Sequence, residues 1–200
     1  MSLIVYPVAT APRIFLPRSF SAELQVNQRA FSSPYGGSEQ VVDLLNDRWA
    51  FSLELAARTH AEAAAMDAFV NAMRGMGNTT ELYHFGRPTN AGTLAGSPTA
   101  QATAQGAASI VLNATTGQTL KAGDMIGVAG LLLQVASDCT AASGAITVPL
   151  VNRLRKAVAS SAPVTVVKPV ATFRLAGTPR VVYVPGYTDA VAMDFTEFIA

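Results

Sequence analysis

Charged residues are scarce in this chain of 200 residues. Lys and Arg number 14 and Asp and Glu 13, so 14% of the residues are charged and the net charge is +1. An average soluble domain carries roughly 25% charged residues, so we expect part of the surface to be hidden in an assembly. The lack of a basic run excludes tight nucleic-acid binding, which needs clustered Lys and Arg to neutralise phosphates. The 50% hydrophobic content excludes a wholly disordered chain.

Cysteine and histidine are also rare: Cys139 is the single cysteine, and His60 and His84 are the two histidines. One cysteine cannot form an internal disulfide, and none of the three residues has a neighbour at metal-ligand spacing. We interpret His60 as a solvated residue in the first turn of a helix and His84 as a half-exposed strand residue. No basic group adjoins Cys139 to activate its thiol. The sequence therefore predicts no metal site, no cofactor and no catalytic residue.

Carboxylates are scattered rather than paired. Glu23, Glu39, Asp43 and Glu54 alternate with apolar residues, which places them on solvent-facing sides of strands. An enzyme that cleaves cell-wall material would need a carboxylate pair or a metal site, and the sequence shows neither. We expect the protein not to be an enzyme.

The apolar N-terminus, MSLIVYPVATAPRIFLP, lacks a basic region and is interrupted by Pro7, Pro12 and Pro17. It therefore matches neither a signal peptide nor a membrane span of about 20 apolar residues. Its weak alternation argues against a core strand, so we expect it to lie across a neighbouring subunit.

The chain consists mostly of short β segments, because β-branched and aromatic residues recur at period two between Gly, Pro, Asn and Ser. The first expected strand covers residues 19–27, and SSPYGG then supplies a turn. Segments 38–45 and 47–55 are expected to pair as antiparallel neighbours. Residues 170–200 return to longer strands, which we expect at a buried edge of the first body.

One amphipathic helix is predicted at about residues 60–75. Thr59 and Glu62 have the spacing of a capping box, and Gly75 and Gly77 are expected to end the helix. Its apolar stripe, at helical spacing, comprises Met66, Phe69, Val70 and Met73.

The composition changes abruptly after this helix. Residues 90–108 carry small and polar side chains, which predicts a linker. Residues 109–168 predict a small inserted all-β module of short strands. The remaining residues, 1–89 plus 169–200, are expected to form one split β-barrel or β-sandwich domain.

Arg153, Arg155 and Lys156 form a short basic cluster after an expected strand of the module. In a monomer this would be a solvated loop. In a ring of identical subunits the same loop would be repeated and would meet an acidic partner surface.

The ordered segments RAFSSPYGGSEQVVDLLNDRWAFSLELAARTHAEAAAMDAFVNAMRG, ELYHFGRP, LKAGDMIGVAG and PVATFRLAG cover much of the chain. Together they resemble distal tail proteins of long-tailed, siphovirus-type bacteriophages and related gene transfer agents. The resemblance implies a β-sandwich or split barrel with one packed helix, assembled as a hexameric ring. Such a ring joins the tail tube on one face to the tail hub and tip proteins on the other, and DNA passes through its lumen. It also implies a virion tail location after assembly in the bacterial cytoplasm, without membrane insertion or specific nucleic-acid binding.

Two alternatives remain open. A tail-tube or tail-completion protein combines a similar sandwich and helix. A host-surface carbohydrate-binding module would use Trp49, Tyr83 or Tyr187 to stack on sugars. Many relatives carry a larger carbohydrate-module-like domain, for which residues 109–168 are short.

Overall fold

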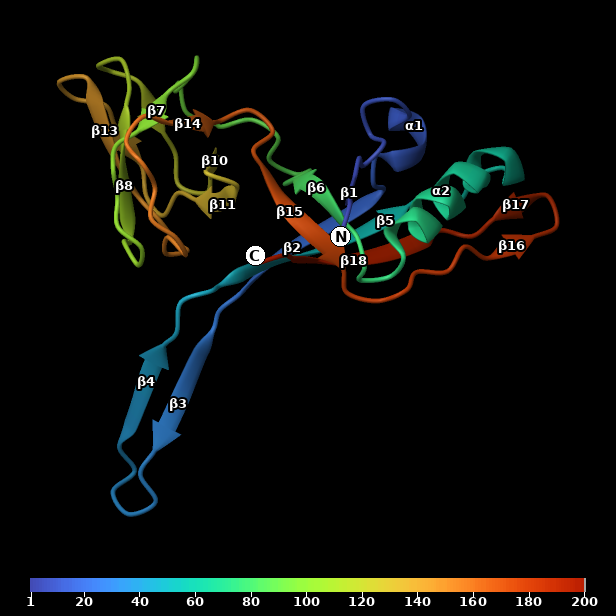
Figure 1. Cartoon of the computed structure of the whole chain (residues 1–200), viewed down its shortest axis with the longest axis horizontal. Helices are drawn as coiled ribbons and strands as arrows, with labels where there is room; N and C mark the ends of the chain where they lie inside the picture. Colours follow the sequence, from blue (N-terminus) through green and yellow to red (C-terminus); the bar gives the residue numbers. More distant parts are fainter. Residues whose placement is uncertain (200) are drawn as a thin grey trace. The chain divides into compact units, whose positions relative to one another are not determined.

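The protein is mainly β, and its described residues include a single long helix, as the sequence predicts (Figure 1). The structure is a computed structural model, and it describes residues 1–199. The chain divides into two compact units. Unit 1 contains Met1–Glu23, Trp49–Gly86 and the chain from Val170 onward, and unit 2 contains Leu24–Arg48 and Arg87–Pro169.

Unit 1 is built on a six-stranded sheet with the order β1-β6-β15-β18-β5-β2. Its strands are β1 (Leu3–Ile4), β2 (Ser19–Gln25), β5 (Arg48–Leu55), β6 (Thr79–Tyr83), β15 (Val170–Leu175) and β18 (Val191–Glu197). Strand β18 was expected at an edge, but it lies inside the sheet because it pairs with both β15 and β5. A further two-stranded sheet joins β16 (Tyr183–Val184) to β17 (Tyr187–Thr188).

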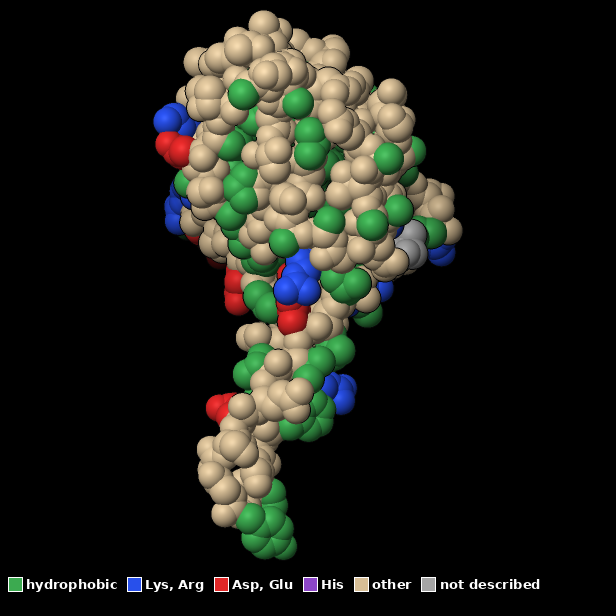
Figure 2. All heavy atoms as spheres, turned by 90° about the vertical axis from the view of Figure 1, so that its left-hand side faces the viewer, with side chains coloured by type: hydrophobic (Ala, Val, Ile, Leu, Met, Phe, Trp, Pro, Cys, Tyr) green, Lys and Arg blue, Asp and Glu red, His purple; other side chains and the backbone are tan. Residues whose placement is uncertain are grey.

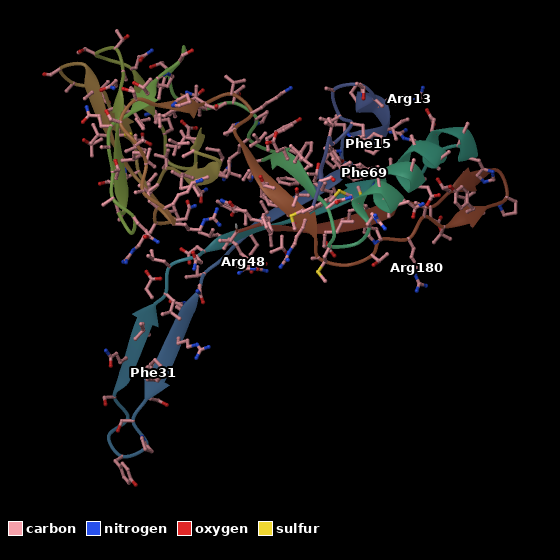
Figure 3. All side chains as sticks on the ribbon, viewed as in Figure 1. Arg13, Phe15, Phe31, Arg48, Phe69 and Arg180 are labelled. Carbon is pink, nitrogen blue, oxygen red and sulfur yellow. The ribbon has the colours of Figure 1, made fainter. Side chains whose placement is uncertain are left out.

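The core of unit 1 combines one face of this sheet with two helices, α1 (Pro12–Phe15) and α2 (His60–Met73). The predicted stripe of α2 is buried throughout, together with Ala63. The expectation that the whole N-terminal segment lies across a neighbour is wrong, because Tyr6 and Phe15 are buried in unit 1 itself. Both rings make edge-on contacts with Phe69 of α2. Figure 3 labels Phe15 and Phe69.

The ends of α2 differ in detail from the prediction. Thr59 has the extended backbone of an N-cap, but its hydroxyl donates to the Glu62 carboxylate at 3.2 Å instead of accepting from the backbone. At the other end the left-handed C-cap is Arg74, at φ 51°, and Gly75 follows at φ 62°. Glycine was expected to provide this turn alone.

Unit 2 contains a six-stranded sheet with the order β11-β10-β14-β7-β8-β13. Its strands are β7 (Thr99–Ala100), β8 (Ser109–Asn113), β10 (Met125–Val128), β11 (Leu131–Gln134), β13 (Ala145–Pro149) and β14 (Ala162–Thr165). A bridge between Val135 and Leu150 joins the two outer strands and closes the sheet into a small barrel. A two-stranded sheet of β9 (Thr119–Leu120) and β12 (Cys139–Thr140) accompanies it.

Residues 90–108 are not a linker. Strand β7 lies between β14 and β8 in the barrel, and both Leu94 and Ala100 belong to its buried core. Small side chains suit this position because the interior of a small barrel leaves little space for larger ones.

Strands β3 (Gln28–Ser32) and β4 (Glu39–Asp43) pair with each other as a two-stranded arm (Figure 1). The predicted pairing of segments 38–45 and 47–55 is therefore wrong. The Pro34-Tyr35-Gly36-Gly37 turn reverses the chain, so β4 returns along β3, and β5 pairs with β18 instead.

Candidate interaction surfaces

The titratable residues of the described chain form no group of three or more His, Cys, Asp or Glu side chains that could hold a metal ion. Among residues 1–199, no helix has the length and hydropathy needed to span a membrane.

Both histidines serve local packing. His60 begins α2, and its Nε2 donates to the carbonyl oxygens of Val184 and Tyr187, at 2.7 and 3.0 Å. The histidine therefore ties the helix to the β16–β17 hairpin, which the sequence pattern did not indicate. The half-buried His84 ring packs edge-on against Phe20, with ring centres 4.9 Å apart.

Cys139 is half-buried at the start of β12, and burial raises the pKa of its thiol above the ordinary value. The reactive thiolate is therefore disfavoured. Nearby, the buried Asp124 accepts hydrogen bonds from the backbone N–H groups of Ala91, Gly92 and Lys121 at 2.7, 3.2 and 2.8 Å. These three donors give Asp124 a structural role, because they fasten the segment before β7 to the turn before β10.

The aromatic residues proposed for sugar stacking do not gather on one surface. Trp49 is 4% exposed in the core of unit 1, whereas Tyr83 is half-buried and Tyr187 is exposed. Residues 87–169 contain no Phe, Trp or Tyr. The barrel therefore has no aromatic side chain of its own on which a sugar ring could stack.

The basic cluster meets acidic and carbonyl oxygens of its own unit. Arg153 forms an ion pair with Asp43 at 3.4 Å, and Arg155 donates to the backbone oxygen of Asp47 at 3.1 Å. Both acceptors lie at the base of the arm. The cluster is thus neither a freely solvated loop nor wholly available to a partner, because two of its three cations hold the arm.

The arm, residues 24–48, has no buried residue along its length. Figure 2 shows hydrophobic side chains along it and at its tip, in the narrow lower part of the view. Tyr35, in the turn, is 99% exposed and Phe31 is 57% exposed. The other large exposed apolar residues of the arm are Val26, Val41 and Leu44.

The β16–β17 hairpin of unit 1 is a second exposed apolar feature. Tyr183 and Tyr187 are 49% and 52% exposed, and Val182 beside them is also exposed. Figure 3 labels Arg180 in the loop that leads into this hairpin. Asp189 follows it, and its backbone N–H donates to the Val182 oxygen at 3.0 Å.

The face of the unit 1 sheet that points away from the core is polar. In β5 and β18 the buried residues alternate with small or charged ones. On this face, Ser52 donates to Asp194 at 2.6 Å and Arg18 pairs with Glu54 at 2.9 Å. A sheet face of this kind contacts water or a hydrated partner rather than a core.

No protein-family model matches the chain, and no curated protein matches it either. The sequence pattern missed both exposed hairpins, although Phe31 and Val41, flanking the SSPYGG turn, were a usable signal for the arm.

Proposed function

We propose that the protein is a non-enzymatic structural component of a bacteriophage tail, a distal tail protein that assembles into a ring. The ring joins the tail tube to the tail hub and leaves a passage for DNA. The resemblance of the ordered sequence segments motivates the proposal, and the mainly β fold with one long helix agrees with it.

The observation that carries the assembly function is the arm. A lone two-stranded hairpin is at best marginally stable in water, and the arm adds no residue to the buried core. Exposed Phe31, Tyr35 and Val41 would be unfavourable in an isolated molecule and favourable inside an interface. The low charge of the chain supports the same conclusion, since the cores of protein interfaces are depleted of charged residues.

The polar face of the unit 1 sheet supports a passage for DNA. Ser52 and Asp194 on this face are hydrogen-bonded to each other, and Glu54 is paired with Arg18. A lumen lined by such groups would present little uncompensated positive charge to hold phosphates. DNA could then slide past without being bound.

Native mass spectrometry and negative-stain electron microscopy of the purified chain test the proposal. We expect a closed ring, six subunits in size, with an open centre. A monomer at every soluble concentration, with no ring when tail tube or hub protein is added, would overturn it. Long stacked tubes would instead favour the tail-tube alternative. Binding on a glycan array would favour the carbohydrate-binding alternative, which the buried Trp49 and the aromatic-free barrel weaken.

A further inference from the structure

The exposed aromatic side chains are divided between two hairpins. Four aromatic residues among the described ones are exposed: Phe31, Tyr35, Tyr183 and Tyr187. The first two lie on the arm in unit 2, and the other two lie on the β16–β17 hairpin in unit 1. Each hairpin is a separate two-stranded sheet. Each unit therefore presents one aromatic hairpin.

The two faces of the arm differ. Residues directly opposite each other in the arm project to the same side, so the pairs Arg29–Val42 and Phe31–Gln40 share one face. Asp43 projects to the other side, where it meets Arg153 of the barrel unit. We call the first the Phe31 face; Figure 3 labels Phe31 on the arm. It is the face left open for a partner, because the ion pair engages the opposite one.

We propose that the Phe31 face of one copy docks on the β16–β17 hairpin of a second copy of this chain. The inference rests on the proposed ring function and names the contact between neighbouring subunits of that ring. Phe31 and Tyr35 would pack against Tyr183 and Tyr187, since aromatic anchors supply much of the binding energy at interfaces.

Charges around the two hairpins are complementary. Arg29 lies on the Phe31 face and Asp189 follows β17; both lie outside the ion pairs found in the described chain. Docking places Arg29 against Asp189, which sets the orientation of the contact.

Symmetry favours a second copy as the occupant. The two contact surfaces are unlike each other and belong to one chain. Such a head-to-tail contact builds a ring when the rotation between copies closes.

Cross-linking between differently tagged chains tests which surfaces meet. In a Cys139→Ser background, one chain carries Phe31→Cys and the other Tyr187→Cys, and the mixture is treated with a short bis-maleimide. We expect a mixed-tag dimer in clear excess over same-tag dimers. Pairing Phe31→Cys with Met76→Cys, an exposed position outside both hairpins, is the matched control and should give little product. Efficient linkage of Phe31→Cys to Tyr187→Cys within one doubly substituted chain, without linkage between chains, would overturn the docking.

Sedimentation equilibrium measures the energetics. We expect Phe31→Ser to raise the apparent dissociation constant about tenfold or more, with an unchanged circular dichroism spectrum, and Met76→Ser to leave it unchanged. Arg29→Glu and Asp189→Arg should each weaken assembly, and combining them should restore it. Rings that persist in all these variants would refute the docking and leave the ring function standing. A wild-type chain that stays monomeric even when tail tube or hub protein is added, together with no cross-link between the two cysteine variants, would refute both.

Discussion

Backbone strain at the end of α2 lies at one residue, Arg74. Arg74 adopts the left-handed conformation at φ 51°, which costs a residue with a Cβ about 1 kcal/mol. Its neighbour Gly75, at φ 62°, adopts it without that cost. Arg74 is exposed and stands outside the ion pairs found in the described chain.

Arg74→Gly should therefore stabilise the protein by about 0.5–1 kcal/mol, because the strain disappears and little packing is lost. Gly75→Ala, the matched control, should destabilise it by a similar amount. Urea unfolding followed by circular dichroism measures both. A loss of stability in Arg74→Gly would show that the arginine side chain matters more than its backbone conformation.

Tyr6 links the stability of unit 1 to alkaline pH. Its hydroxyl donates to the Phe15 oxygen at 2.8 Å, and burial, with a smaller contribution from Tyr83, raises its pKa well above the ordinary value of 10. Above pH 10 the unfolded chain loses this proton while the folded chain keeps it. The free energy of unfolding should therefore fall as pH rises beyond 10.

Tyr6→Phe should cost about 1–2 kcal/mol below pH 10, because the Phe15 carbonyl loses its donor. Above pH 10 its stability should depend less steeply on pH than that of the wild type. Tyr35→Phe is the control, since Tyr35 is 99% exposed and should alter neither quantity. Urea titrations measure the free energy of unfolding between pH 8 and pH 11, a range that spans the ordinary tyrosine pKa of about 10. Parallel pH profiles for wild type and Tyr6→Phe would contradict the prediction.

At the scale of elements, the segment before β7 approaches β9 so closely that it requires glycine. A Cβ built on Gly92 would lie 2.1 Å from the Thr119 carbonyl oxygen, and the Gly92 N–H donates to Asp124. Gly92→Ala should destabilise the barrel by at least about 2 kcal/mol, because backbone has to move. Gly36→Ala, where the added Cβ would only approach Ser33 Oγ at 3.8 Å, should be nearly neutral in the same thermal-unfolding measurement. Equal stability of the two variants would contradict this account.

The arm can be shortened while the hydrogen bond between Asn27 and Leu44, where the arm begins, is kept. The Leu44 N–H donates to the Asn27 oxygen at 2.8 Å, so replacing residues 28–43 by Asn-Gly closes a two-residue turn between them. Because the arm contributes no buried residue, we expect the melting temperature to change by no more than a few degrees. Melting is compared at concentrations where the wild type is monomeric, since assembly itself raises apparent stability. A large drop would show that the arm supports the fold of its own chain.

Across the whole molecule, local sequence patterns predicted the helix and the strands better than they predicted which strands pair with each other. The stripe from Met66 to Met73 is buried as its spacing requires, and β8 and β13 alternate between buried and more exposed residues within the segment 109–168, where short strands are predicted. The pairing of β4 with β3 rather than with β5 depends on contacts between distant residues, which periodicity does not report. Small residues gave no signal that Ala100 lies in a barrel wall.

The exposed hairpins show the same limit for function. The sequence offers Tyr187 as a possible sugar contact, and its pattern does not distinguish Tyr183 from other strand residues. Whether an aromatic residue is buried like Trp49 or exposed like Tyr35 depends on the tertiary fold. The sequence shows the basic cluster, but the ion pair between Arg153 and Asp43 joins residues far apart in the chain, so the sequence does not show that the cluster contacts the arm.

The chain leaves unit 1 after β6 and returns to it at β15, and these two points are close enough for the barrel between them to be deleted. Tyr83 and Val170 are directly paired in the unit 1 sheet, so the chain leaves and returns at neighbouring points. Deleting residues 87–169 and joining Gly86 to Val170 would leave a three-residue loop, His84 to Gly86, of a length that hairpins accommodate. We expect the shortened chain to keep a cooperative thermal transition, because the packing of Phe51 on Phe173 and of Phe69 on Phe15 lies within unit 1. The separate fragment 87–169 should also unfold cooperatively, since its barrel is closed and has its own core. Loss of the transition in the shortened chain, with the fragment still folded, would show that the split sheet depends on the barrel for its stability.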